Sequence, residues 1–222
     1  MQLDDIGRKY GTDKSSVNHN YLNVYETYLQ YFKDKPINML EIGYGGYENP
    51  NRGGESIQTW LEYFPKGTVT CLEYYDKHYR CDRYNYFKGD QSNIDNLEEL
   101  GEKYGPFDLI VDDGSHQSAH IITSFKCLFP NFLKDGGLYI VEDTVTSYLN
   151  VCRGSTGNPT ADTTTMGFFT KEVHGLFHRS FDNNHEIQHL KKEFCKPYSK
   201  FLSFIHFYHE LVLIGKGESA II

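Results

Sequence analysis

The chain has 222 residues, long enough for one α/β domain with a sizeable core. Hydrophobic residues make up 39% of the sequence and charged residues 23%, proportions typical of a globular protein and not of a disordered one. The formal net charge of −8 argues against nonspecific nucleic-acid binding, which requires Lys and Arg to neutralise phosphates.

The cysteines and the amino-terminal sequence indicate the compartment. The cysteines are odd in number and form no CxxC pair, which excludes a disulfide framework and zinc-ligand spacing. The first residues are polar and lack the apolar region of a secretory signal, and no apolar stretch approaches the length of a membrane span. We therefore expect a cytoplasmic protein.

Hydrophobic periodicity alternates between helix and strand along the chain. Apolar residues at helical spacing from Tyr21 to Phe32 predict a helix that ends before Pro36. The run Ile37–Gly43 predicts a buried strand that enters a glycine-rich turn, and residues 57–64 form the next helical pattern. Four further segments have the pattern of strands: Thr68–Tyr74, Tyr84–Phe87, Phe107–Asp112 and Leu138–Glu142.

The second half of the chain predicts a helix and then a hairpin. Residues 118–133 have an apolar helical face, and Phe201–Tyr208 and Leu211–Gly215 are strand-like runs separated by only two residues. Strands alternating with helices indicate βαβ units. We predict one α/β domain over residues 1–222, with a Rossmann-like, doubly wound, mostly parallel seven-stranded sheet and a C-terminal antiparallel strand. Residues 144–162, rich in Gly, Ser, Thr and Asn, are predicted to form a loop over the active site.

Polar or glycine-rich groups follow five consecutive predicted strands, where ligands bind in an open parallel sheet. Gly43 and Gly45 begin a turn that allows close approach of a ligand. A nicotinamide dinucleotide requires a regular GxGxxG turn facing its pyrophosphate, and the inserted residues 47–52 disrupt that spacing. S-adenosylmethionine (SAM) has no phosphate and tolerates the insertion, so we expect SAM.

Acidic residues at the other strand ends complete the predicted cofactor site. Glu73 is placed to accept hydrogen bonds from ribose hydroxyls, a role that an acid also has in NAD folds, and Asp90 to bind the adenine amino group. Glu41 and Asp112, at the ends of the first and fourth strands, are included in the predicted site. The alternative for Glu73 and Asp90 is that they are solvated loop acids, and for Asp112 that it is a turn or capping residue.

Three carboxylates at adjacent strand ends predict a metal site. Asp113, Glu142 and Asp143 would lie in one small volume, where unpaired carboxylates repel each other unless a cation neutralises them. Oxygen ligands of this kind favour Mg²⁺ or Mn²⁺. His116, three residues after Asp113, is within reach of that site and is suited to act as a general base. The alternative is that these are turn residues beside a surface histidine.

These residues, in this order, resemble the class I SAM-dependent sugar O-methyltransferases of macrolide antibiotic pathways, the macrocin and mycinamicin type. The resemblance covers most of the chain and is carried by Lys9–Lys14, Leu40–Gly43, Gly89–Ser92, Phe107–His116 and Val141–Tyr148. It implies that Asp113, Glu142 and Asp143 bind the metal and that His116 is the catalytic base.

The resemblance extends to the cofactor and acceptor. It implies that Glu73, where the family more often has Asp, binds ribose, and that Asp90, Gln91 and Ser92 lie on the adenine side. Residues 1–35 resemble a helical lid that includes Lys14, His19 and Tyr21. From their position in the lid and the active-site loop, Tyr21, Tyr148 and Arg153 are the candidate substrate contacts. We expect a small sugar-containing acceptor, free or nucleotide-linked, no nucleic acid and no membrane span; the sequence also allows a homo-oligomer.

Three other functions are compatible with parts of the pattern. The first is O-methylation of a non-sugar acceptor with vicinal oxygens, because such oxygens bind a metal in the same way. The second is a nicotinamide-dependent sugar oxidoreductase, although the sequence lacks a convincing GxGxxG turn. The third is a SAM-binding partner subunit without turnover, against which the complete set of carboxylates and histidine argues.

Overall fold

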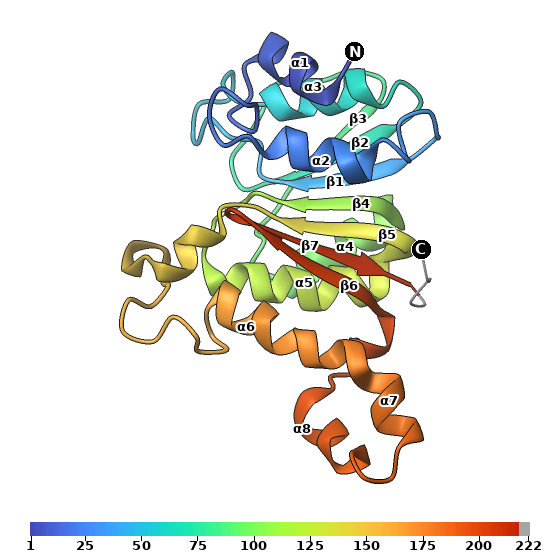
Figure 1. Cartoon of the computed structure of the whole chain (residues 1–222). Helices are drawn as coiled ribbons and strands as arrows, with labels where there is room; N and C mark the ends of the chain where they lie inside the picture. The colour runs from blue at the N-terminus through green and yellow to red at the C-terminus, as the bar shows by residue number, and fades with distance from the viewer. Residues whose placement is uncertain (218–222) are drawn as a thin grey trace. The chain divides into compact units, whose positions relative to one another are not determined.

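The computed structural model describes residues 1–217, so the predicted end of the domain at residue 222 lies outside the described residues. The chain forms two compact units, Met1–Asp90 and Gln91–Ile222. The strand order is β3-β2-β1-β4-β5-β7-β6, which confirms the predicted seven-stranded sheet (Figure 1).

The first unit has three parallel strands and three helices. Strands β1 and β2 pair in parallel, and β2 pairs in parallel with β3. Helix α1, which the hydrophobic pattern did not reveal, has acidic residues in its first turn and basic residues in its last, as the helix dipole favours. The elements are α1 (Leu3–Tyr10), α2 (Tyr21–Leu29), β1 (Asn38–Ile42), α3 (Glu55–Tyr63), β2 (Thr68–Glu73) and β3 (Tyr84–Lys88).

The core of the first unit is aromatic. Trp60 of α3 stacks on Tyr25 of α2 with ring centroids 5.9 Å apart, and both side chains are fully buried. Cys71 of β2 is a buried free thiol in this core. Burial of aromatic surface of this size is a major source of stability, so α2 and α3 are held firmly to each other.

The second unit contains the remaining four strands. Strands β4 and β5 are parallel, β7 is antiparallel to β5, and β6 pairs with β7 as the predicted hairpin. Strand β5 begins at Leu133, five residues before the predicted start, because helix α5 ends directly before it. These elements are α4 (Ile94–Tyr104), β4 (Phe107–Asp112), α5 (Ser118–Phe132), β5 (Leu133–Val141), β6 (Leu202–Tyr208) and β7 (Leu211–Lys216).

The segment between β5 and β6 is more helical than the sequence suggested. The predicted loop 144–162 contains two short 3₁₀ helices, and six further short helices follow it (Figure 1). Helix α6 packs on α5 because Phe168 and Phe169 both contact the ring of Phe125. The elements are η1 (Thr144–Tyr148), η2 (Asn150–Cys152), α6 (Thr165–Glu172), η3 (Val173–Phe177), α7 (His178–Asn183), η4 (Gln188–Leu190), α8 (Lys191–Phe194) and η5 (Ser199–Phe201).

No helix within residues 1–217 has both the length and the hydropathy that a membrane span requires.

Candidate active site

Asp113, His116 and Asp143 form a compact group at the carboxyl ends of β4 and β5. The two strands pair in parallel with Asp112 opposite Val141, so the residues that follow them emerge at the same edge of the sheet. One possible ligand atom of each of the three residues lies within 4.8 Å of the others. His116 Nε2 is 4.0 Å from Asp113 Oδ1 and 3.7 Å from Asp143 Oδ2. The structure therefore brings together two predicted metal ligands and the predicted base.

Two members of this group have a backbone conformation that non-glycine residues rarely adopt. His116 has a φ of 56° and Asp143 a φ of 51°, both in the left-handed region. Such conformations cost free energy and persist only where the surroundings impose them, and they cluster at functional sites. Here they turn the chain sharply after β4 and after β5.

Gln91 and Asp112 hold the turn that carries Asp113 and His116. Gln91 Nε2 donates to Asp112 Oδ1 at 2.6 Å, and Gln91 Oε1 accepts from the Ser115 amide at 2.9 Å. Tyr139 donates to Asp112 Oδ2 at 3.0 Å. Complete burial raises the pKa of Asp112 to about 7, against the opposing effect of these hydrogen bonds. Gln91 and Asp112, both predicted cofactor residues, thus shape the turn through internal hydrogen bonds. Contact of either residue with the cofactor remains a prediction.

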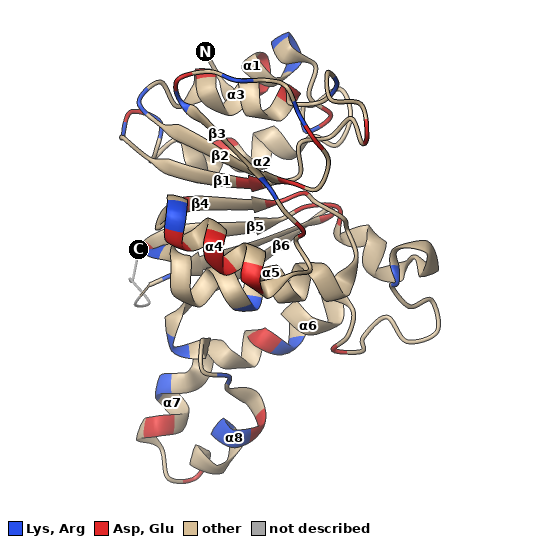
Figure 2. Cartoon of the chain, turned by 180° about the vertical axis from the view of Figure 1, so that it is seen from behind, with Lys and Arg blue, Asp and Glu red and all other residues tan. Residues whose placement is uncertain are grey.

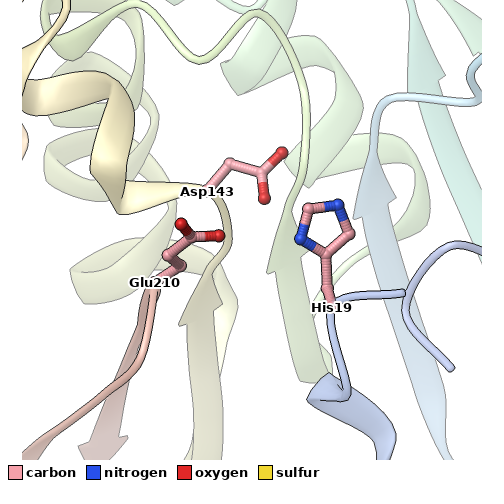
Figure 3. A group of neighbouring side chains, drawn as sticks. All are labelled: His19, Asp143 and Glu210. Carbon is pink, nitrogen blue, oxygen red and sulfur yellow. The ribbon is translucent and has the colours of Figure 1, made fainter. Parts of the chain in front are cut away.

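Glu142 and Glu210 are the other acids near Asp143. Glu142 is almost fully buried and is not part of the Asp113–His116–Asp143 group, so its role as a metal ligand remains a prediction. Glu210 lies in the β6–β7 turn, and its carboxylate and that of Asp143 have oxygens within 4.8 Å of each other (Figure 3). Glu210 was not predicted from the sequence, although an acid in the two-residue turn of the predicted hairpin was a usable signal. His19, also labelled in Figure 3, belongs to the first unit.

The predicted glycine turn after β1 has the expected conformation. Gly43 has a φ of 98° and Gly45 a φ of 78°, values that favour glycine. A Cβ at Gly53 would lie 2.5 Å from the Gly45 carbonyl oxygen, so this turn tolerates no side chain there. The loop 44–53 is therefore built around close backbone contacts.

The acids of the first unit also shape this turn. Glu73 accepts hydrogen bonds from the Tyr44 amide at 2.8 Å and the Tyr75 amide at 2.9 Å. Glu41 is fully buried and accepts from Ser56 Oγ at 3.0 Å and from Trp60 Nε1 at 3.1 Å. Glu73 thus holds the loops that follow β1 and β2, and Glu41 holds helix α3 against β1. The predicted contacts of both acids with the cofactor are not tested by these bonds.

The remaining predicted residues differ in exposure. Asp90 is half-buried and Ser92 is exposed, as ligand contacts require. Tyr148 is 43% exposed and Arg153 is exposed, so both are accessible to an acceptor. Tyr21 is only 2% exposed and stacks on His19, so it would contact a substrate only after a rearrangement.

The strand order with an antiparallel β7 and the polar strand ends define the class I methyltransferase fold. A crystal structure of the MycE methyltransferase from the mycinamycin pathway, in complex with Mg, SAH and mycinamycin VI, matches all of this chain and 56% of that protein, with a TM-score of 0.85 and 28% identity. A second crystal form of MycE with Mg and SAH matches with a TM-score of 0.89 and 29% identity, over all of this chain and 55% of that one.

Sequence comparison gives the same group of enzymes. The chain is 35% identical over 219 residues to a rhamnosyl tetracenomycin-C 2'-O-methyltransferase of Streptomyces olivaceus, covering 98% of this chain and 55% of the relative. It is 30% identical to the mycinamicin VI 2''-O-methyltransferase of Micromonospora griseorubida, covering 98% of this chain and 53% of the relative. The predicted resemblance to the mycinamicin and macrocin type is confirmed. The chain spans about half the length of these relatives. No protein-family model matches it.

Proposed function

We propose that this chain is a SAM-dependent O-methyltransferase that uses a divalent metal to methylate a hydroxyl of a sugar-containing small molecule. The observation that carries the proposal is the group of Asp113, His116 and Asp143 at the ends of β4 and β5. The similarity to sugar O-methyltransferases over 98% of the chain supports it.

The side chains present fit a hard divalent cation. Asp113 and Asp143 supply carboxylate oxygens, and their side chains are 23% and 26% exposed, so an ion can reach them. Two carboxylates this close to each other are stabilised by a cation. Asp113 and Asp143 would hold the metal, with Glu142 as the third predicted ligand and Glu210 as a further carboxylate beside Asp143.

His116 is positioned to move the proton. When bound, Mg²⁺ lowers the pKa of an acceptor hydroxyl, and SAM provides the methyl group. The His116 imidazole accepts the proton of the acceptor hydroxyl, and the Asp143 carboxylate, 3.7 Å from Nε2, stabilises the imidazolium. The Gln91 bonds to Asp112 and Ser115 keep this turn in place during the transfer.

The cofactor contacts complete the proposal. Gly43, Gly45 and Glu73 in the first unit are proposed to bind the amino-acid and ribose parts of SAM, and Asp90 and Ser92 the adenine. Tyr148 and Arg153 are proposed acceptor contacts, because both are exposed and follow Asp143 along the chain.

The surroundings of the enzyme are also part of the proposal. Five free cysteines suit a reducing cytoplasm. In Figure 2, α4 is mostly acidic, and α7 and α8 each carry both acidic and basic residues, a surface that does not favour nucleic acid. Light scattering on the purified chain tests the proposed homo-oligomer.

Calorimetric titration with S-adenosylhomocysteine (SAH), with NAD⁺ as the control, tests the cofactor. We expect micromolar binding of SAH and none of NAD⁺. Binding of NAD⁺ alone would overturn the methyltransferase proposal and favour an oxidoreductase.

The acceptor and metal are tested by transfer of labelled methyl groups from SAM. We expect transfer to glycosides with neighbouring hydroxyls and loss of transfer in excess EDTA, restored by Mg²⁺. Full activity in EDTA would overturn the metal assignment, and transfer to catechols but not to glycosides would overturn the sugar assignment.

A further inference from the structure

The Lys77 ammonium is buried in the loop that follows β2 and is surrounded by carbonyl oxygens. Lys77 is only 1% exposed. Nζ donates to the carbonyl oxygens of Gly45 at 2.6 Å and Tyr47 at 2.7 Å, with longer contacts to Asn49 at 3.2 Å and Arg52 at 3.3 Å. All four oxygens belong to the loop that follows β1.

This arrangement resembles a cation site in which the ion is part of the protein. Burying an ammonium group is costly unless polar groups replace its water. A lysine has three N–H donors, and rings of backbone carbonyls bind monovalent ions in the same way. The Tyr44 ring, with its centroid 5.3 Å from Nζ, adds a cation–π contact. The loop therefore closes around the charge of Lys77.

The loop needs such a support because its backbone is unusual. Gly45, Gly46, Tyr47 and Gly53 all have positive φ. Glycine-rich backbone loses more conformational entropy on ordering than other sequences do, so a fixed shape requires outside contacts. A second contact comes from the neighbouring His78 amide, which donates to the Pro50 carbonyl at 3.0 Å.

The direction of the carbonyls also determines the direction of the amides. In a trans peptide the N–H points away from the C=O of the same unit. The carbonyls of Gly45, Tyr47 and Arg52 face Lys77, so the N–H groups of the residues that follow them face away from it. The loop thus presents N–H groups on the side opposite the ammonium.

We propose that Lys77 is a positioning residue for the cofactor: its ammonium holds loop 44–53 in the shape that binds SAM. This inference rests on the proposed function, because loop 44–53 contains Gly45 of the proposed cofactor site. Lys77 itself touches no substrate. Its contribution is to keep the binding loop ordered before the cofactor arrives, which lowers the entropy lost on binding.

The first test compares SAH affinity in two matched variants. Lys77→Met keeps the length of the side chain and removes the charge. Lys216→Met is the control, since Lys216 is also buried and donates to the carbonyls of Pro130 at 2.7 Å and Leu133 at 2.6 Å, at the end of α5. We expect Lys77→Met to weaken SAH binding about tenfold to a hundredfold. Lys216→Met should lower thermal stability and leave SAH affinity unchanged.

Chemical rescue separates positioning from general destabilisation. In Lys77→Ala, added methylammonium carries the same three donors into the space and should strengthen SAH binding. Tetramethylammonium has the charge but no N–H donor, so it should not. Equal effects of the two cations would overturn the inference.

The wild-type protein provides the test if the variants do not fold. Coupling between two sites is reciprocal, so bound SAH should slow hydrogen exchange at the Lys77 ammonium. Unchanged exchange would overturn the role of Lys77. Wild-type protein that binds no SAH would overturn the proposed function, whereas equal SAH binding by wild type and Lys77→Met would overturn the Lys77 inference alone.

Discussion

His116 and Asp143 show how single residues shape the candidate site. Both have positive φ, and their side chains meet with 3.7 Å between Nε2 and Oδ2. His116 Nδ1 is buried and has no hydrogen-bond partner in the part of the chain that the structure describes. A histidine held in a strained conformation beside a carboxylate is suited to proton transfer.

Substitution of His116 tests its role as a base. We expect His116→Ala to lower turnover about 10²- to 10⁴-fold, the usual contribution of a general base, with SAH affinity unchanged. His120→Ala is the control, because His120 Nδ1 lies 2.8 Å from Ser115 Oγ and outside the Asp113–His116–Asp143 group. Steady-state kinetics measure both variants. Turnover of His116→Ala equal to that of the wild type would remove His116 from the mechanism.

Glu172 gives a prediction on pH and stability. Burial raises the pKa of its carboxyl above the ordinary 4.5, although Tyr198 donates to Oε1 at 2.9 Å. Because the pKa of Glu172 is higher in the folded state than in the unfolded state, its carboxyl stabilises the fold at pH values below the unfolded-state pKa. This contribution to the free energy of unfolding is lost as the pH rises through the folded-state pKa. The free energy of unfolding of Glu172→Gln should therefore increase relative to wild type from pH 4 to pH 8.

Urea unfolding of both proteins across this pH range measures the difference. The exposed Glu99, substituted as Glu99→Gln, is the control and should show a much smaller trend. A constant difference between wild type and Glu172→Gln at all pH values would contradict the assignment of a raised pKa.

At the scale of secondary-structure elements, the packing of α4 on α5 contributes to stability. A Cβ added at Gly101 of α4 would lie 2.5 Å from the ring of Phe132 in α5. The absence of a side chain at Gly101 therefore allows α4 and α5 to pack closely.

Gly101→Ala tests this packing. Alanine is about 1 kcal/mol better than glycine inside a helix. Overpacking against Phe132 costs about 1–3 kcal/mol. We expect a net loss in the free energy of unfolding, measured with urea, and recovery when Phe132→Leu is added. Gly157→Ala, where a Cβ has open space, should be neutral. A more stable Gly101→Ala variant would show that Phe132 moves aside without cost.

Ligand binding connects the site to the stability of the whole molecule. A ligand that binds only the folded state stabilises it by about 2.7 kcal/mol at a hundred times its Kd. Mn²⁺ and SAH should each raise Tm of the wild-type chain. In Asp113→Asn the shift with Mn²⁺ should disappear and the shift with SAH should remain, as thermal unfolding scans can show. A Mn²⁺ shift that persists in Asp113→Asn would place the metal elsewhere.

Most of the sheet was predictable because strand formation depends on local patterns. The apolar runs of β1, β2 and β4 are buried along nearly their whole length, and buried parallel strands appear in a sequence as continuous apolar segments. The β6–β7 hairpin was also predictable, because only two residues separate its two strand-like runs and a hairpin forms between segments that are close in sequence. The short helices of residues 165–201 were not predicted, since each is too short to show a regular apolar period and α6 is held by contacts of Phe168 and Phe169 with Phe125 of α5, which is distant in sequence.

The residues of the candidate site also differ in whether the sequence alone could predict them. That Asp113 and Asp143 meet follows from the sequence, because they lie within two residues of the ends of strands that a parallel sheet places side by side. Glu210 beside Asp143 and Lys77 within loop 44–53 were visible only in the tertiary structure, since each depends on the path of a loop and on a contact between distant segments. Local periodicity determines which residues lie at a strand end, whereas packing between segments determines which side chains converge there.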